Sequence, residues 1–415
     1  MTIPPQLLSI EDALDRLGEI VTPIAETEHT KLVTAAGRTL KNAVLAPIDM
    51  PPFDSSAMDG YALHDSVLDS GETTYTVIGE SRAGHPFTGV VANGQCARIF
   101  TGAMLPKGAN SVVLQEDVRR LENTITVSPD ETIRHGMNIR FQASDVAKGK
   151  KLLHQGQILN DFHIGWLAAC GVESVSTSRK PKIGLFSTGD ELQDPGSVLL
   201  PGQIYDSNRI SLQQLIRHHA VEIVDFGRLP DDQEITRNCI DQATQEVDLL
   251  LTSGGVSVGE SDFVRPVVEE IGELTFWNIA LKPGKPLAVG LIRDCVFFGL
   301  PGNPVSTIVT YLLFVNRAIE LISGANPRRP LKLSAILTND LHHSVGRREY
   351  QRGTLWKNDS ELSVTTVLDQ GSNRLTSFAE ANCLVEVPES SGNLVAGSRV
   401  DVVLLSDKTN HIWSV

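Results

Sequence analysis

Blocks of apolar residues alternate with blocks of helical spacing between residues 181 and 325. The apolar runs have the length of buried strands and the intervening segments are amphipathic, with strands expected at 182–187, 221–227 and 248–251 and helices at 211–219 and 234–245. Strands that alternate with helices usually pair in parallel, because each helix carries the chain back across one face of the sheet. The pattern therefore predicts a three-layer α/β/α domain over residues 181–327.

The last part of this domain is expected to be a hairpin followed by a long helix. Two extended runs at 287–292 and 295–300 flank Arg293-Asp294, and an apolar helix is predicted over 305–322. Asn303 is its expected N-cap, with Pro304 at the first helical position, where a missing N–H costs nothing.

The N-terminal third reads as two intertwined parts. Ser9 is expected to cap a helix over 12–20, and a second helical pattern surrounds 158–169. We expect these two helices to pack together, so that 7–50 and 141–180 form one helical and extended, discontinuous N-terminal domain. Short β-like runs between glycine, proline and asparagine turns predict an inserted β-rich domain over 51–140.

The chain after Pro327 alternates as strands again. At about 85 residues it is too short for a second α/β unit. We predict a C-terminal, barrel-like β domain over 328–415, which makes the whole a multidomain α/β protein.

Charge limits the ligands that the protein can bind. The chain has 36 basic and 50 acidic residues, a net charge of −14, and no basic run that could follow a nucleic-acid backbone. Nucleic-acid binding is therefore disfavoured. The overall field also repels small anions, so any anion site must be built locally from Lys, Arg and backbone N–H groups.

Five scattered cysteines form neither CxxC pairs nor an even disulfide set. They indicate a reducing compartment and are expected to be small buried apolar side chains. The N-terminus has no basic-then-apolar signal, and we identify no run that approaches the length of a membrane span. We therefore expect a soluble cytoplasmic protein that does not bind a membrane.

A glycine-rich loop follows the predicted strand at 248–251. Gly254, Gly255 and Gly259 let the backbone turn its N–H groups toward an anion, while Glu260 and Asp262 add carboxylates beside it. A bare carboxylate repels phosphate, so the combination is best explained by a divalent cation such as Mg²⁺ between them. The alternative, that Ser261 or Asp262 merely caps a helix over 263–271, is about equally supported by this unit alone.

Neighbouring loops carry carboxylates at equivalent places. Glu191 follows the first strand of the predicted sheet, Asp231 the second and Asp262 the third. Each alone is more often a helix cap or a solvated loop acid. Because ligands of open α/β sheets bind beyond the carboxyl ends of the strands, the three together favour one shared site.

Positive charge appears at Lys282-Pro283-Gly284-Lys285-Pro286. The prolines stiffen this turn, so both ammonium groups would be held in place, which suits an oxyanion or a phosphate. A lysine-bearing turn in solvent is the alternative. We find no HExxH, GxSxG or Walker motif, so the pattern favours metal-assisted phosphate chemistry with water or a ligand as the attacking group.

Motifs along nearly the whole chain resemble, in order, those of the MoeA and gephyrin E-domain family, the molybdopterin molybdenumtransferases: PPFDSSAMDGYA, TGAMLPKGANSVV, STGDEL, YDSNR, LTSGGVSVGESDF, KPGKPLA and GLPGNPVS. The resemblance implies a MogA-like α/β domain and a cytoplasmic homodimer, joined through the N-terminal domain, whose cleft lies between the α/β domain of one subunit and the β-rich domain of the other. It implies an enzyme that takes adenylylated molybdopterin, hydrolyses the phosphoanhydride with Mg²⁺, inserts molybdate at the dithiolene sulfurs and releases AMP. Transient contact with a molybdopterin adenylyltransferase is also implied.

Site roles follow from the matched motifs. The family resemblance implies catalytic or metal-binding roles for Asp262, Glu191 and Asp231, with Asp59 and Thr101 reaching the cleft from the partner subunit. The substrate-binding residues that it implies are Gly254, Gly255, Ser257, Pro301 and Asn303 for the nucleotide and phosphates, and Lys282, Lys285, Ser377 and one of Arg347, Arg348 or Arg352 for molybdate.

Two departures from the family pattern are visible. Ser55 stands where the family often has Asn, and Ala143-Ser144-Asp145 replaces Gly-Glu-Asp, which leaves a ligand role for Asp145 in doubt. Two other functions stay open: a nucleotide-processing enzyme built on the same α/β module, and a gephyrin-like scaffold. The KPGKP lysines and the inserted β domain argue against the nucleotide-processing enzyme. We identify no linker or fused second catalytic domain, which favours the transferase over the scaffold.

Overall fold

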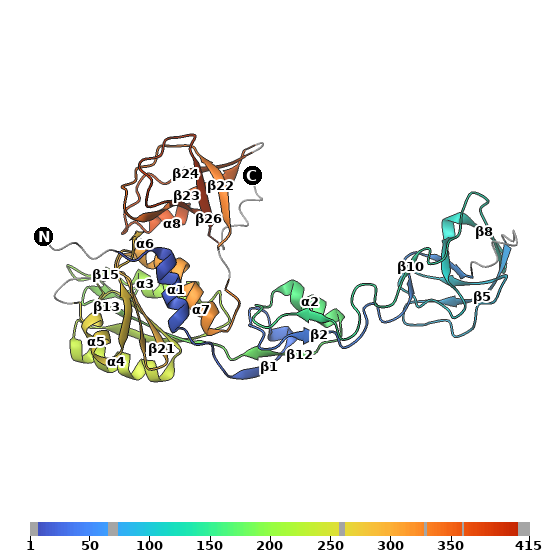
Figure 1. Ribbon diagram of the computed structural model, residues 1–415, viewed down its shortest axis with the longest axis horizontal. Helices are drawn as coiled ribbons and strands as arrows, with labels where there is room; N and C mark the ends of the chain where they lie inside the picture. The colour runs from blue at the N-terminus through green and yellow to red at the C-terminus, as the bar shows by residue number, and fades with distance from the viewer. Residues whose placement is uncertain (1–6, 65–73, 257–261, 328–329, 359–360, 406–415) are drawn as a thin grey trace.

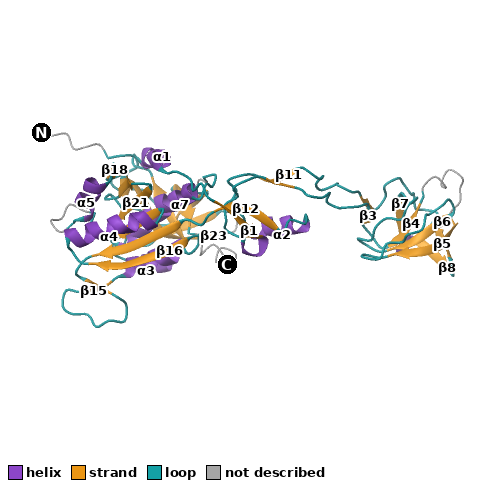
Figure 2. Cartoon of the chain, turned by 90° about the horizontal axis from the view of Figure 1, so that it is seen from below, coloured by secondary structure: helices purple, strands orange, loops and turns teal. Residues whose placement is uncertain are grey.

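The computed structural model describes residues 7–64, 74–256, 262–327, 330–358 and 361–405. The molecule is elongated. The α/β domain and the C-terminal β domain lie together at one end, a small N-terminal domain lies in the middle, and the β-rich domain forms an arm at the far end (Figures 1 and 2).

A six-stranded sheet forms the centre of the α/β domain. Its order is β16 (Glu222–Leu229), β13 (Lys182–Thr188), β17 (Leu249–Ser253), β21 (Cys295–Leu300), β20 (Ala288–Ile292) and β18 (Glu273–Trp277). The first four strands are parallel, which confirms the parallel pairing predicted for β16, β13 and β17. The predicted hairpin is confirmed, since β20 pairs antiparallel with β21 from Ile292↔Cys295 onward, and β18 adds a further antiparallel strand that the sequence pattern did not indicate.

Helices cover both faces of this sheet, which confirms the three-layer architecture. On one face lie α3 (Ser207–Ile216) and the segments α6 (Pro304–Thr310), η4 (Tyr311–Val315) and α7 (Asn316–Ile322) of one long helix. The other face is covered by α4 (Gln233–Glu246) and α5 (Val264–Ile271). Each helix buries an apolar stripe against the strands, as expected for an amphipathic helix on a sheet.

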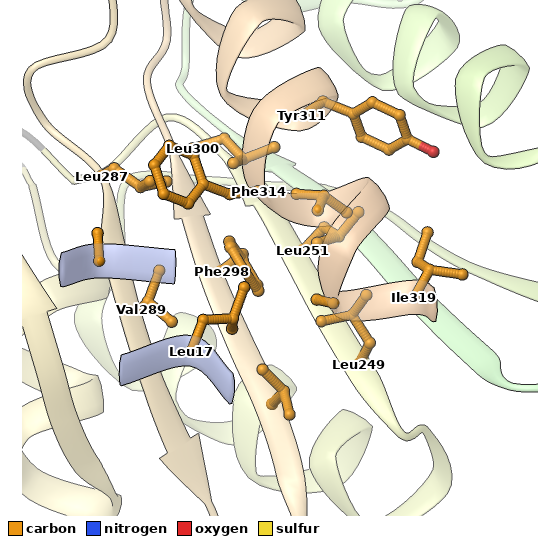
Figure 3. Packing of buried hydrophobic residues seen from close by; sticks show 14 of the residues in the cluster. Leu17, Leu249, Leu251, Leu287, Val289, Phe298, Leu300, Tyr311, Phe314 and Ile319 are labelled. Atoms are coloured by element: carbon orange, nitrogen blue, oxygen red, sulfur yellow. The ribbon is translucent and has the colours of Figure 1, made fainter. Parts of the chain in front are cut away.

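The first helix packs where the sequence analysis did not place it. Helix α1 (Ile10–Ile20) is capped by Ser9, whose hydroxyl accepts the N–H of Asp12 at 3.0 Å. Its Leu17 is fully buried against the α/β domain, in the same cluster as Phe298 and Ile319 (Figure 3). The prediction that this helix packs against the one near 158–169 is therefore wrong. The sheet offers its apolar stripe a far larger surface to bury.

The helix pattern near 158–169 forms α2 (Asp161–Ala169) in the small N-terminal domain. This domain also contains β1 (Thr27–Lys31) paired with β12 (Ser174–Ser178), β2 (Val44–Leu45) paired with β11 (Lys151–Leu153), and η1 (Leu32–Thr34). α2 buries Leu167 in a separate core with Leu40 and Leu153. Its apolar residues are spread around the helix, so it has no single face with which to bind a second helix.

The arm is a small β domain reached by two extended connections. Its sheet has the order β7 (Ser111–Leu114), β4 (Gly60–Leu63), β6 (Gln95–Ile99), β5 (Thr74–Ser81), β9 (Thr124–Val127) and β8 (Val118–Leu121), with η3 (Gln115–Asp117) before β8. At its base β3 (Ser55–Ser56) pairs with β10 (Ile139–Arg140). Figure 1 shows this arm well separated from the α/β domain of the same chain.

The C-terminal domain is a closed five-stranded barrel, which confirms the barrel-like prediction. It consists of β22 (Lys332–Leu337), β23 (Arg348–Lys357), β24 (Leu362–Thr366), β25 (Cys383–Val387) and β26 (Arg399–Leu404), with α8 (Thr376–Glu380) before β25. The barrel closes where β23 pairs with β25. A short strand of the α/β domain, β19 (Leu281–Lys282), joins its edge by pairing in parallel with β23.

The segment Pro304–Ile322 corrects one expectation, because it is long and apolar enough to cross a membrane. However, 61% of its most apolar window is buried inside the protein, where Phe314 and Ile319 contact the sheet (Figure 3). That is the arrangement of a core helix in a soluble protein.

Candidate functional site

A pocket of about 250 Å³ opens at the carboxyl ends of the parallel strands. Loops that follow β13, β16, β17 and β21 line it, as the sheet topology requires. It brings together six residues singled out from the sequence: Glu191, Asp231, Asp262, Gly254, Gly255 and Pro301. Sequence positions as far apart as 191 and 301 therefore meet at one place.

Two glycines form the floor of the pocket after β17. Gly254 and Gly255 have φ of 96° and 70°, a region that favours glycine. A Cβ atom on Gly255 would lie 2.5 Å from the Val264 side chain, and one on Gly254 would lie 2.9 Å from the Thr188 carbonyl oxygen. Only glycine fits at these two positions. The backbone there carries no side chain, so a ligand can approach it closely.

The carboxylates come from three different loops around this floor. Glu191 follows β13, Asp231 follows β16, and Asp262 precedes α5. The first two loops are tied together, since the N–H of Asp231 donates to Asp190 Oδ1 at 3.2 Å and the N–H of Asp190 lies 3.5 Å from Asp231 Oδ2. This pairing holds Asp231 beside the pocket.

Residues 257–261 lie outside the described part of the chain, so the predicted roles of Ser257, Gly259 and Glu260 have no structural counterpart here. Within the described ranges, no three His, Cys, Asp or Glu side chains come close enough together to hold a metal ion on their own. Mg²⁺ commonly uses only one or two protein carboxylates and completes its shell with substrate phosphates and water. The pocket's donors fit a site of that kind, in which the ligand supplies part of the coordination.

The lysine turn lies beside the pocket and against the barrel. Pro286 lines the pocket, whereas Lys282 and Lys285 do not. Lys282 is half-exposed and its Nζ donates to Glu349 Oε2 of the barrel at 3.1 Å, while Lys285 is exposed. The predicted rigid turn is thus held at one of its two lysines.

Arg352 and Ser377 of the barrel contact each other. The Nε of Arg352 donates to Ser377 Oγ at 3.0 Å and its Nη2 to the Gly371 carbonyl at 3.2 Å, and both side chains are buried. Burial lowers the pKa of Arg352 to about 10, opposed by the negative charges of Glu349 and Asp369. This is one of the three arginines proposed for the oxyanion.

The other two arginines have different surroundings. Arg348 is held by carboxylates, since it forms ion pairs with Glu389 at 2.9 Å and with Glu11 of α1. Arg347 lies 3.5 Å from the carbonyl of Leu281, next to the lysine turn. Arg348 therefore fastens the barrel to the first helix, and Arg352 is better placed to act with Ser377.

Asp59 and Thr101 meet on the arm. The backbone N–H and the hydroxyl of Thr101 both donate to Asp59 Oδ1, at 2.7 and 2.9 Å. These hydrogen bonds, with a smaller contribution from Arg98, lower the pKa of the exposed Asp59 carboxyl. Neither residue lines the pocket of its own chain.

Comparison with known proteins identifies the family. Residues 8–171 match the MoeA N-terminal region (domain I and II), 184–320 a probable molybdopterin binding domain, and 334–405 the MoeA C-terminal region (domain IV). The chain is 39% identical to the molybdopterin molybdenumtransferase of Haemophilus influenzae over 98% of its own length and all of that protein. The chain belongs to the molybdopterin molybdenumtransferase (MoeA) family. It is therefore an enzyme of molybdenum cofactor biosynthesis, as the motifs suggested.

Other members agree with this assignment. A molybdopterin molybdenumtransferase of Nostoc is 32% identical over 96% of this chain and 93% of its own. The crystal structure of the molybdopterin biosynthesis moeA protein from Pyrococcus horikoshii OT3 superposes with a TM-score of 0.83 at 31% identity, covering 96% of this chain and all of that one. The fold is thus that of MoeA proteins over nearly its full length.

One residue of the MoeA-family pocket was missed from the sequence. Asn208 of α3 lines the pocket, and its Nδ2 donates to Ser253 Oγ and to the Gly302 carbonyl, both at 2.7 Å. It joins the loops after β17 and β21. The YDSNR motif contains this asparagine, but only the fold shows which two loops it bridges.

Three further residues lie at the edges of the site. Asp206 caps α3 by accepting the N–H of Arg209 at 3.0 Å. Asn303 precedes Pro304 as the N-cap residue, although its side chain makes no capping hydrogen bond and it does not line the pocket. Asp145 is exposed where the arm joins the N-terminal domain, and its N–H donates to the Met50 carbonyl at 3.0 Å.

Proposed function

We propose that this MoeA-family enzyme takes adenylylated molybdopterin, hydrolyses its phosphoanhydride in a Mg²⁺-dependent step, inserts molybdate at the dithiolene sulfurs and releases AMP. The observation that supports it best is the single pocket that combines a bare glycine backbone with carboxylates from three loops. A phosphate beside carboxylates needs a cation between them, so this composition favours a metal-bridged pyrophosphate over a free anion.

In this proposal the pocket residues have three different roles: phosphate binding, metal binding and positioning of the loops. Gly254 and Gly255 allow close approach of the nucleotide phosphates, and Asp262, Asp231 and Glu191 are the candidates to hold Mg²⁺ together with the substrate. When bound, Mg²⁺ would neutralise charge on the phosphate oxygens and make the phosphorus more electrophilic. Asn208 keeps the floor of the pocket and the Pro301-Gly302 loop at a fixed spacing.

The lysine turn is the proposed molybdate site. Lys282 and Lys285 supply positive charge at the edge of the pocket, and Arg352 with Ser377 lies in the adjoining barrel. Ammonium and guanidinium groups are the donors that oxyanions prefer. A chain with a net charge of −14 needs such a local concentration of cations to bind a dianion.

A homodimer completes the proposed site. Asp59 and Thr101 belong to the arm, which Figure 2 shows far from the α/β domain, and neither lines the pocket of that domain, so they can serve a MoeA-type cleft only by reaching the pocket of a second copy. Exposed apolar side chains on the N-terminal domain, such as Val33 and Phe162, supply surface for that association. A cytoplasmic location and transient contact with an adenylyltransferase that delivers the substrate are part of the same proposal.

The reaction is tested by incubating the purified protein with adenylylated molybdopterin, Mg²⁺ and molybdate. We expect AMP release that requires both molybdate and Mg²⁺, and that EDTA stops it while added Mg²⁺ restores it. AMP release that ignores molybdate would contradict the transferase reaction. Cleavage of adenylylated molybdopterin without molybdenum insertion would instead support a nucleotide-processing enzyme.

The dimer is tested by complementation. Asp59→Asn and Asp262→Ala subunits are co-expressed with different tags, and the mixed dimer is purified. If each site combines one subunit's arm with the other's pocket, the mixed dimer has one doubly altered site and one intact site, and regains about half of the wild-type activity. A site built within one chain would leave both sites damaged, and the mixed dimer inactive.

A further inference from the structure

Glu349 is a buried carboxylate at the junction of the α/β domain and the barrel. It lies on β23, directly opposite Lys282 of β19 in the parallel pairing of the two strands. Its Oε2 accepts hydrogen bonds from Lys282 Nζ at 3.1 Å and from His343 Nδ1 at 2.7 Å. The carboxylate is 3% exposed, whereas the lysine side chain is 40% exposed. One end of this network is therefore fixed in the barrel and the other faces outward.

The charges of the network follow from its donors. An ionised carboxylate can only accept, so Nδ1 of His343 carries a proton. The histidine side chain is fully buried, and its Nε2 is without a hydrogen-bond partner within the described residues. His343 therefore holds Glu349 through its Nδ1–H from inside the barrel, while Lys282 contacts the same carboxylate oxygen from the outer side.

The same carboxylate also influences Arg352. Its negative charge favours the protonated guanidinium and opposes the effect of burial on that group. Glu349 therefore acts on two of the cations assigned to the oxyanion site, one from each domain.

Docking of the barrel does not depend on this carboxylate alone. The β19–β23 pairing includes Leu281↔Arg348, and Arg348 forms ion pairs with Glu11 and Glu389. Buried ion pairs contribute little net stability once desolvation is included. Stabilisation of the contact between the two domains therefore explains little of why Glu349 is buried opposite Lys282.

We propose that Glu349 is a positioning residue for the molybdate step: it holds the Lys282 ammonium at the oxyanion site, with two of its three N–H donors left for the oxyanion. This inference rests on the proposed function. A lysine has a flexible four-carbon stem, and anchoring its end removes much of the entropy that oxyanion binding would otherwise cost. His343 keeps the carboxylate oriented, and the barrel thereby adjusts a lysine of the α/β domain.

The test is Glu349→Gln in the full-length enzyme, assayed for molybdate-dependent AMP release. Glutamine keeps the shape and one acceptor but loses the charge that holds the ammonium. We expect the apparent KM for molybdate to rise about tenfold with kcat within about twofold. Affinity for AMP, measured by calorimetry, should not change. Glu349→Asp, which keeps the charge on a shorter stem, should give a smaller rise.

Glu386→Gln is the matched control. Glu386 is a buried carboxylate of the same barrel that also accepts from a lysine, Lys332, at 2.7 Å, and from Tyr350 at 3.1 Å. It lies on β25, opposite Tyr350 of β23, and within the described part of the chain it is not a hydrogen-bond partner of Lys282. We expect this variant to lose a similar amount of thermal stability and to keep the molybdate KM of the wild type.

Two results would overturn the inference. An unchanged molybdate KM in Glu349→Gln would mean that the residue only stabilises the contact between the two domains. A lowered KM would mean that the carboxylate competes with the oxyanion for Lys282. Lys282→Ala separates this from failure of the proposed function. If Lys282→Ala has a normal molybdate KM, the oxyanion site itself is misplaced. If Lys282→Ala is impaired and Glu349→Gln is not, only the positioning role fails. Should Glu349→Gln not fold, Glu349→Asp carries the same comparison.

Discussion

Thr101 donates two hydrogen bonds to one oxygen of Asp59, from its backbone N–H at 2.7 Å and from its hydroxyl at 2.9 Å. The two residues are 42 positions apart and are joined at the surface of the arm. A carboxylate that is exposed and yet held in one orientation is prepared to act on a group outside its own chain. This pair is therefore the arm's best candidate for contact with the substrate.

The pKa of Asp59 should depend on Thr101. The fold lowers this pKa through the two Thr101 hydrogen bonds, so the stabilisation is complete above the ordinary carboxyl pKa of 3.8 and is lost as pH falls through the lowered value. Thr101→Val removes the hydroxyl donor but keeps the N–H, and the pKa of Asp59 should rise part of the way to 3.8. Carboxyl NMR titration measures this. Thr101→Ser, which keeps both donors, should titrate as the wild type does.

Asp262→Ala should leave the fold intact and abolish AMP release. The residue lies at the pocket, where loss of a proposed metal-binding carboxylate is expected to lower kcat by more than about a hundredfold. Thermal unfolding should stay near the wild-type curve, because Asp262 is only partly buried. Asp130→Ala, an exposed loop acid of the arm, serves as the control. Turnover close to that of the wild type would remove Asp262 from the mechanism.

Asn208→Ala should weaken both the pocket and the fold. Its Nδ2 makes two 2.7 Å hydrogen bonds in a buried position, and removing it leaves Ser253 and the Gly302 carbonyl without that donor. We expect a loss of about 1–3 kcal/mol in the free energy of unfolding, measured with urea, and weaker AMP binding. Ser253→Ala removes one of the two contacts and should cost less. Equal AMP affinity in wild type and Asn208→Ala would show that these two hydrogen bonds do not shape the nucleotide site.

Gly255→Ala should be more damaging than a comparable glycine change elsewhere. Gly255 has φ of 70°, and a Cβ there would lie 2.5 Å from Val264 and 3.0 Å from the Thr188 hydroxyl. Gly94 has a similar φ of 73° but no atom within 4 Å of an added Cβ. Gly94→Ala therefore reports backbone strain alone, about 1–2 kcal/mol, and Gly255→Ala adds a steric clash. Equal losses in chemical denaturation would show that the pocket floor can relax.

Much of the pocket could be predicted from the sequence because its parts are local. The carboxylates at 191, 231 and 262 each follow or precede a recognisable element, and a parallel sheet brings such loops to one edge. Gly254 and Gly255 were identifiable because few other residues tolerate their backbone angles. The choice among Arg347, Arg348 and Arg352 was not predictable, since arginines so close together in the sequence differ only in what the rest of the fold places beside them.

The first helix shows the limit of local patterns. Its apolar stripe and its Ser9 cap could be predicted from the sequence, but such a stripe can pack on any apolar surface. The sheet of the α/β domain offers a larger apolar surface than the helix near 158–169. Asn208 and Glu349 were missed for a related reason. Their partners, Gly302 and Lys282, are 94 and 67 positions away, and no periodicity connects residues at such separations.

The sequence by itself determined most of the strands and helices of the α/β domain, the glycine-rich floor and the candidate site residues, because these depend on side-chain periodicity, backbone freedom and short motifs. Only the tertiary structure decided which groups meet. It placed Lys282 beside Glu349, Arg352 beside Ser377, and Asp59 with Thr101 on an arm far from the α/β domain that carries the pocket. Contacts between domains depend on how whole surfaces pack, and that information is spread over many residues rather than carried by any one segment.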